Sequence, residues 1–189
     1  MKPLLLATCL TLAAGGASAW TLDSDVSSVS FVSMKNAEVA EAHSFGSVAG
    51  SVDDSGKAVV EITLASVNTG IDIRDERMRD HLFDVASTPL AVVTADVGLD
   101  ALEDLAVGAR KTVELPLTVA AHGSEISYDA DVHVTRISED RVAVSSITPV
   151  IVEAFDFAYE DGVEQLREIA GLDSIQFAVP VGFDLVFQR

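Results

Sequence analysis

Cysteine is almost absent from this sequence. The single cysteine, Cys9, lies within residues 1–19, together with Lys2, an apolar run over residues 4–14 and the small-residue ending Ala17-Ser18-Ala19. This arrangement is typical of a secretory signal peptide, and we predict cleavage after Ala19. Residues 20–189 would then contain no cysteine, which excludes disulfides and thiol chemistry. Because export without disulfides favours a bacterial periplasm, we expect a secreted, periplasmic protein.

Basic residues are scarce as well. Lys and Arg together number 12 against 30 Asp and Glu, which gives a formal net charge of −18 at pH 7. A chain this acidic repels nucleic acid and anionic membrane surfaces, so neither is an expected partner. The simplest interpretation of the carboxylates is solubility, or life in a salty medium. After the signal peptide no apolar run is long enough for a membrane-spanning helix. The sequence does not decide between a monomer and a homodimer.

Catalytic and metal-binding motifs are also missing. The chain has no G-x-S-x-G elbow and no glycine-rich phosphate loop. The histidines, His43, His81, His122 and His133, lack the close ligand spacing of a zinc site. We therefore predict no catalytic residue and no metal site, and the sequence does not indicate an enzyme.

What the sequence does have is alternation of apolar and polar residues with a period of two, which is typical of β-strands. It is clear in residues 58–67, 112–119, 124–136 and 177–187. About eight such strands follow one another closely, which predicts an all-β fold with antiparallel pairing, either a barrel or a sandwich. An outer-membrane barrel is disfavoured, because 6% aromatic residues are too few for two aromatic girdles. Pro116 lacks an N–H donor, which predicts an unpaired or bulged position beside it.

Two stretches interrupt the strand pattern. The first, residues 66–89, predicts a helix from about Arg74 to Val85, with Asp72 as its N-cap. The second, residues 153–172, predicts a helix of about ten residues that ends just before Gly171. The fold prediction is therefore a barrel or sandwich with one or two short helical insertions.

Three stretches carry a resemblance to a known family. They are WTLDSDVSSVSFVSMKNAEVAEAHSF near the start, SVNTGIDIRDERMRDHLFDVASTP in the first interruption, and AVPVGFDLVF near the end. Together they resemble the YceI-like family of bacterial periplasmic proteins, over essentially all of residues 20–189. The sequence departs from the common family pattern in two places. Met78 follows Arg77 where many members place a histidine, and Thr88 replaces the usual aromatic residue before the proline.

The resemblance implies a lipocalin-like, eight-stranded antiparallel barrel over residues 20–189, with a tunnel that holds an isoprenoid chain. We therefore expect a soluble periplasmic carrier of a quinone-like or polyprenyl lipid. No cofactor is expected apart from such a bound isoprenoid lipid or quinone. Because the protein is so acidic, we predict a neutral head group rather than a pyrophosphate.

The predicted ligand-binding residues are of two kinds. Inward-facing residues of the strands would line the tunnel, and apolar residues of the first interruption would form a lid or side wall. The strand residues are Phe31, Ile62, Leu64, Leu115, Leu117, Tyr128, Phe177, Phe183 and Leu185; the lid residues are Met78, Leu82 and Phe83.

Two other functions remain open at this point. A barrel filled by its own side chains could act through its surface, as a stress-related or electron-transport accessory that binds another protein. An enzyme acting on an isoprenoid would need a convergent set of polar residues inside the barrel.

Overall fold

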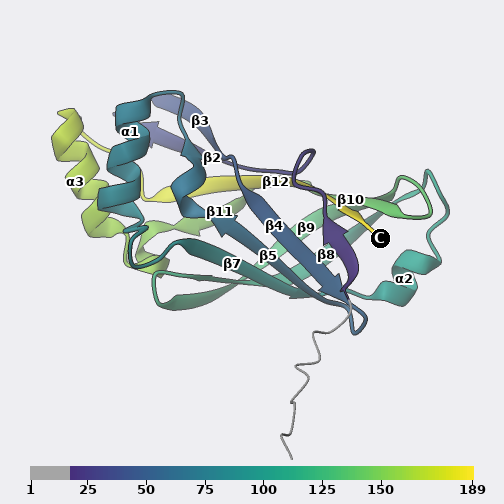
Figure 1. The fold of residues 1–189 in the computed structure, drawn as a ribbon. Helices are drawn as coiled ribbons and strands as arrows, with labels where there is room; N and C mark the ends of the chain where they lie inside the picture. Colours follow the sequence, from purple (N-terminus) through teal and green to yellow (C-terminus); the bar gives the residue numbers. More distant parts are fainter. Residues whose placement is uncertain (1–17) are drawn as a thin grey trace, which may run out of the picture.

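The computed structural model describes residues 18–189 (Figure 1). The predicted signal peptide, apart from its last two residues, lies outside the described residues and stays a prediction. The described chain forms an antiparallel β-barrel with short helices at both ends. Its strands are β1 (Ser18–Leu22), β2 (Ser28–Lys35), β3 (Val39–Phe45), β4 (Val48–Asp53), β5 (Lys57–Thr63), β6 (Val67–Asn68), β7 (Leu90–Asp96), β8 (Arg110–Ala121), β9 (Ser124–Arg136), β10 (Arg141–Ser146), β11 (Val150–Glu153) and β12 (Ala178–Gln188). Its helices and helical turns are η1 (Leu64–Ser66), α1 (Asp72–Arg77), η2 (Met78–Leu82), α2 (Leu99–Glu103), η3 (Ala154–Phe157) and α3 (Glu160–Ala170).

The strand segments combine into eight longer strands around the barrel. β1 and β2 lie along one edge of β12, and β10 and β11 lie along its other edge. In the same way β3 leads into β4, and β5 leads through η1 into β6. β7, β8 and β9 complete the ring, which closes where β12 pairs with β1. The predicted eight-stranded antiparallel barrel is confirmed.

Glycine lies where the barrel wall bends or is crowded. Gly46 stands between β3 and β4, and its N–H donates to the carbonyl of Ser66 at 2.9 Å. A Cβ at Gly50 would lie 2.8 Å from the carbonyl oxygen of Val59 on β5, so a larger residue would force the strands apart. Glycine at these two positions lets the sheet bend or bulge there.

A loop over residues 23–27 separates β1 from β2. There the Asp23 N–H donates to the carbonyl of Val186 at 2.8 Å, and the Ser27 hydroxyl accepts from the Val186 N–H at 2.9 Å. The loop therefore supplies the hydrogen bonds that β12 needs, while β2 continues along the same strand edge.

The helix predicted in the first interruption begins at Asp72 and changes into the π-helical turn η2 at Met78. Asp72 is its first residue and not its N-cap, which is Ile71. The carboxylate that ties down this segment belongs to the buried Asp75, which accepts from the Thr69 N–H at 2.8 Å and the Thr69 hydroxyl at 2.5 Å.

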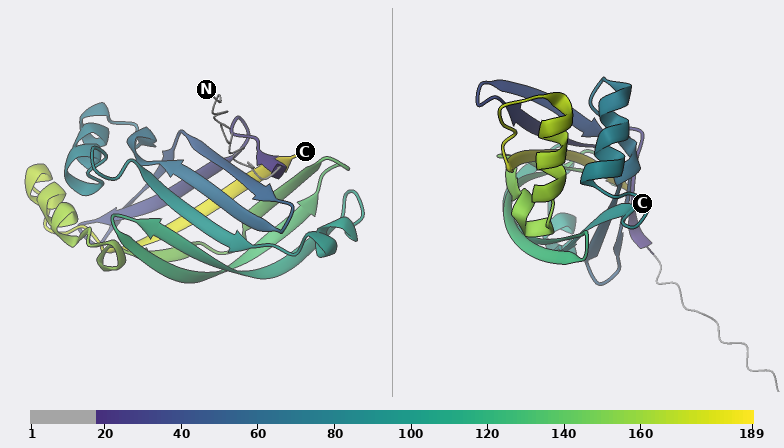
Figure 2. Two further views of the ribbon diagram at one scale, coloured as in Figure 1. Left: turned by 60° about the horizontal axis from the view of Figure 1, so that its bottom comes forward. Right: turned by 90° about the vertical axis from the view of Figure 1, so that its left-hand side faces the viewer.

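The helix predicted in the second interruption is α3, and it ends at Gly171 with φ 63° as expected. It packs closely on η2 through Gly162, where a Cβ would lie 2.5 Å from the His81 carbonyl oxygen. Figure 2 shows α1 and α3 side by side over one end of the barrel, with α2 at the opposite end. No helix within residues 18–189 is long and apolar enough to cross a lipid bilayer.

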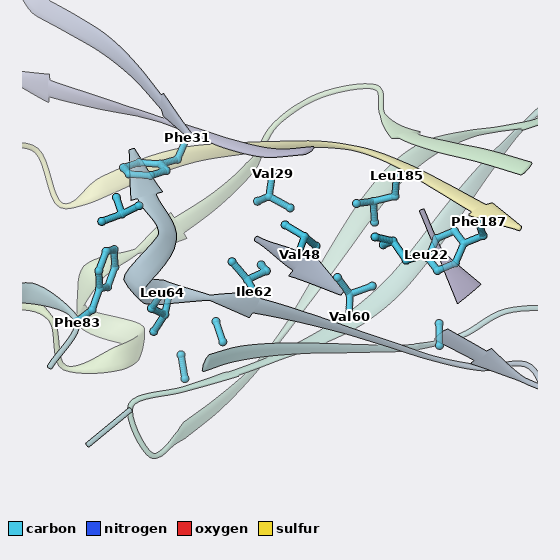
Figure 3. Packing of buried hydrophobic residues seen from close by; sticks show 14 of the residues in the cluster. Leu22, Val29, Phe31, Val48, Val60, Ile62, Leu64, Phe83, Leu185 and Phe187 are labelled. Carbon is cyan, nitrogen blue, oxygen red and sulfur yellow. The ribbon is translucent and has the colours of Figure 1, made fainter. Parts of the chain in front are cut away.

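The buried core runs along the barrel from one end to the other. In Figure 3, Phe31, Leu64 and Phe83 gather near the helices α1 and α3, whereas Leu185 and Phe187 lie toward the other end. Phe31, Leu185 and Phe187 belong to the inward-facing sets of β2 and β12, as the period of two of a strand requires. Leu64 belongs to η1, and Phe83 directly follows η2.

Candidate functional site

A cavity of about 450 Å³ occupies the half of the barrel nearest α2. Its wall comes from inward-facing residues of the strands, and most of them are valine, alanine or leucine. On β8 alone, Val113, Leu115, Leu117 and Val119 follow one another along the wall. Such small and medium side chains leave the centre of an eight-stranded barrel open for a ligand.

We place the mouth of the cavity between β7 and β8, because the exposed residues of its wall gather where the pairing of these strands ends. Pairing of these strands runs from Val92–Ala120 to Ala95–Leu117 and stops there. The residue of β8 just before Leu117 is Pro116, which has no N–H to contribute to the ladder. The predicted unpaired position beside Pro116 is confirmed, and it marks the edge of the opening.

The exposed residues of the cavity wall all lie beside this opening. They are Asp96 and Gly98 at the end of β7, and Lys111, Glu114 and Pro116 on the first half of β8. Apart from the indole nitrogen of the buried Trp20, the polar side chains of the wall are therefore confined to the mouth.

The short helix α2 covers the cavity next to its mouth. Leu99, Leu102 and the following Leu105 face the cavity from this segment. The guanidinium of Arg136 holds its last turn, because it donates to the carbonyls of Leu102 at 3.2 Å and Leu105 at 3.3 Å. Sequence reasoning missed α2, because Leu99, Leu102 and Leu105 are only three apolar positions and give a weak periodic signal.

The opposite end of the barrel is filled by a chain of aromatic rings, which we name the aromatic plug. Phe31, Phe45, Phe83 and Tyr159 contact one another in that order through tilted and edge-on rings, with centroid distances of 5.3, 5.9 and 5.8 Å between successive rings. None of these four residues lines the cavity. The barrel is therefore hollow in one half and packed in the other.

Two polar groups are buried beside the plug. His43 is only 5% exposed, lies against Phe31 and shares a hydrogen bond of 2.7 Å with the Ser33 hydroxyl. Burial, helped by the positive charge of Arg74, lowers the pKa of His43. Burial also raises the pKa of Tyr159 to about 12, and its buried hydroxyl has no hydrogen-bond partner within residues 18–189.

A further polar link joins η3 to the barrel. The Tyr128 hydroxyl donates to the Asp156 carboxylate at 2.7 Å. Burial, and then this hydrogen bond, raise the pKa of Tyr128. Tyr128 therefore anchors the turn η3 against the barrel.

Arg74 of the first interruption joins an ion-pair network with charged side chains of β2 and β3 outside the plug. Glu41 bonds Lys35 at 2.8 Å and Arg74 at 2.9 Å. Lys35 and Arg74 lower the pKa of the Glu41 carboxyl, the hydrogen bond from Lys35 contributing most. Arg74 also donates to the Thr69 carbonyl at 2.7 Å, so this arginine fixes the start of α1.

The structure separates the predicted ligand-binding residues into three groups. Ile62, Leu115, Leu117, Phe183 and Leu185 line the cavity. The second group, Phe31, Leu64, Met78, Leu82, Phe83 and Tyr128, packs in or against the core without lining the cavity. Phe177 does not line the cavity. Its ring contacts the ring of the exposed Phe155, with 4.8 Å between the two centroids.

The predicted lid therefore closes the barrel at the end remote from the cavity, and α2 covers the cavity itself. Sequence reasoning also missed Trp20 and the valines of β9 and β10 in the cavity wall. Within residues 18–189 no cluster of three or more His, Cys, Asp or Glu residues could hold a metal ion.

The fold and the cavity together define a hollow lipocalin-like barrel with an apolar cavity inside. The chain belongs to the YceI-like family, because the model of the YceI-like domain matches residues 20–187. It is similar to the solved structure of a polyisoprenoid binding domain from Saccharophagus degradans implicated in plant cell wall breakdown. That similarity has 39% identity and a TM-score of 0.90, and covers 92% of this chain and 99% of that one.

A second solved structure shares the fold alone. BcnA from Burkholderia cenocepacia is 17% identical, with a TM-score of 0.64 over 87% of this chain and 98% of that one. None of the curated proteins matches this chain.

Proposed function

We propose that this protein is a periplasmic carrier that holds one isoprenoid-type lipid in the cavity. The observation that supports this function best is the apolar chamber of about 450 Å³ with its single group of exposed residues at one mouth. The polyisoprenoid binding domain from Saccharophagus degradans, which is 39% identical, points to the same class of ligand.

The size of the cavity suggests a short isoprenoid chain. A water-sized group needs about 15 to 30 Å³, so about 450 Å³ holds roughly 15 to 30 carbon atoms. That range corresponds to roughly three to six isoprene units. Enclosing fifteen carbons contributes roughly 12 kcal/mol of apolar burial, before the large cost of ordering the chain.

The charges around the cavity favour a neutral head group. Asp96 and Glu114 are two carboxylates at the mouth, against the single ammonium of Lys111. A pyrophosphate would therefore approach a mouth with an excess of negative charge, in a protein with net charge −18. A quinone or another neutral head meets no such repulsion.

The other two functions have less support. The cavity is evidence against the filled barrel that would act only through its surface, although the aromatic plug does fill one half. Within residues 18–189 the cavity wall also holds no convergent set of polar groups away from its mouth, and such a set is what an enzyme on an isoprenoid would need.

Native mass spectrometry of the protein purified from its own periplasm tests the proposal. We expect an added mass that organic extraction releases as a neutral isoprenoid lipid. Leu115→Trp narrows the cavity and should reduce the fraction of protein that carries the added mass, whereas Thr112→Trp, an exposed position of β8, should leave that fraction unchanged. A protein without any lipid would contradict the carrier function, and a diphosphate lipid as the main adduct would contradict the neutral head.

A further inference from the structure

Lys111 stands out among the residues of the cavity wall. It is the only basic residue that lines the cavity within residues 18–189. Along β8 it belongs to the inward-facing set, two residues before Val113 and four before Leu115. Across the ladder it pairs with Val134, which also lines the cavity. Its side chain therefore starts from the inner wall of the barrel.

The two carboxylates of the mouth are placed differently. Glu114 is on the outward-facing set of β8, and Asp96 lies one residue after the inward-facing Ala95 of β7. Among the ionic side chains of the mouth, Lys111 alone originates on the inner face. No ion pair or hydrogen bond engages its ammonium group within residues 18–189, so its donors are available.

The geometry of β8 gives a bound chain a direction. From Lys111 to Leu117 the strand rises roughly 20 Å, at about 3.4 Å per residue. The methylene stem of a lysine can lie along an apolar wall while its ammonium stays near water. A ligand with its tail against Leu115 and Leu117 would thus present its polar end to the ammonium.

We propose that Lys111 binds the head group of the ligand by donating a hydrogen bond from its ammonium to a carbonyl oxygen. This inference rests on the proposed carrier function and adds the head-group contact and the orientation of the ligand. A quinone-type carbonyl suits the site because Asp96 and Glu114 offset the single positive charge of Lys111. The tail then points into the barrel, toward the aromatic plug.

A set of ligands with one tail and different heads tests this assignment. Farnesene, farnesol, a farnesyl benzoquinone and farnesyl pyrophosphate share the same apolar chain. Their affinities are measured by competition with a fluorescent apolar probe, for the wild-type protein, Lys111→Met and Lys111→Arg. Arg110→Met is the matched control, because it removes a positive charge from the other face of the same strand.

We expect the benzoquinone to bind the wild-type protein more tightly than farnesene. Lys111→Met should lower the affinity for the benzoquinone roughly tenfold, which is the loss expected for one hydrogen bond to a charged group. The affinity for farnesene should not change. Lys111→Arg should retain most of the preference for the benzoquinone, and Arg110→Met should change neither affinity.

Other outcomes would overturn the assignment. Equal losses for benzoquinone and farnesene in Lys111→Met would indicate an effect on the wall and not on the head group. Unchanged benzoquinone binding would mean that Lys111 serves only to keep an open strand edge from pairing with other chains. Tightest binding of the pyrophosphate would contradict a carbonyl head. If farnesene and the other three ligands all fail to bind, the carrier function itself is wrong.

Discussion

The two ends of this barrel are built on the same strands and differ in the side chains that point inward. At the end under α1 and α3, the rings of Phe31, Phe45, Phe83 and Tyr159 meet and leave no room. At the end under α2, the wall is mostly valine, alanine and leucine, and a cavity of about 450 Å³ remains. The packed half is closed by rings from β2 and β3 together with rings from the two helical insertions, so side-chain volume, and not the number of strands, decides which half of the barrel is hollow.

Truncating a ring of the plug should give the largest effect. Phe83 is 7% exposed and contacts both Phe45 and Tyr159, so Phe83→Ala should lower the free energy of unfolding by about 3–5 kcal/mol. Leu115 is half-buried and lines the cavity, so its side chain borders empty space. Leu115→Ala should therefore lower the free energy of unfolding by much less than Phe83→Ala. Urea denaturation of both variants measures the difference. Equal losses would show that the two halves are packed alike.

Adding a methyl group at the closed end should also destabilise the fold. Gly162→Ala places a Cβ 2.5 Å from the His81 carbonyl oxygen, which forces α3 away from η2. We expect a loss of about 1–3 kcal/mol, although alanine favours a helix more than glycine does. Gln165→Ala, exposed on the same helix, is the control and should be neutral or slightly stabilising. A more stable Gly162→Ala protein would mean that the helices do not pack closely.

Acidification should lower the free energy of unfolding through the protonation of His43, which is buried at the closed end. Its pKa is lowered in the folded state, mainly by burial and then by Arg74, so the unfolded chain binds this proton more readily. The stability linked to His43 is therefore present above its ordinary pKa of about 6.5 and is lost as the pH falls below it, by at most about 1.4 kcal/mol per pH unit.

Urea denaturation at about pH 7.5 and about pH 5 measures this dependence. His43→Gln should show a smaller loss on acidification than the wild-type protein. His81→Gln, which alters an exposed histidine, should behave like the wild type. If His43→Gln and the wild-type protein lose the same free energy of unfolding on acidification, His43 is not the source of the pH dependence.

The smallest expected effect concerns the Tyr159 hydroxyl. It is buried without a hydrogen-bond partner within residues 18–189, so removing it should be neutral or stabilise the protein by about 1 kcal/mol. Thermal and urea unfolding of Tyr159→Phe test this expectation, with Tyr128→Phe as the contrast. Tyr128→Phe loses the 2.7 Å bond to Asp156 and should be destabilised. A marked loss in Tyr159→Phe would indicate that the hydroxyl has a partner such as a bound water.

The fold could be predicted from the sequence because alternation identifies each strand independently. The inward faces of β8 and β9, the unpaired position at Pro116 and the end of α3 at Gly171 follow from local patterns. The loop at residues 23–27 and the short strands β6 and β11 were missed, because they depend on which strand edge is available. α2 was missed because five residues give little periodic signal.

The position of the cavity could not be predicted in the same way. A period of two tells which residues point inward, and it says nothing about how far along the barrel each one lies. Phe31 and Leu185 are therefore equivalent in sequence terms, yet one belongs to the plug and the other to the cavity wall. Met78 and Phe83 were expected to cover the ligand, and they close the opposite end. Tertiary placement alone distinguishes these residues.

Trp20 gives the protein an internal optical reporter. It is the only tryptophan of the sequence, it is 2% exposed, and it lines the cavity. All indole emission from the protein therefore originates at the wall of one chamber, and a quinone ring within reach of that indole would quench it by electron transfer. Under the proposed carrier function, binding and release of such a ligand would change this emission, in real time, without a label and without altering a residue.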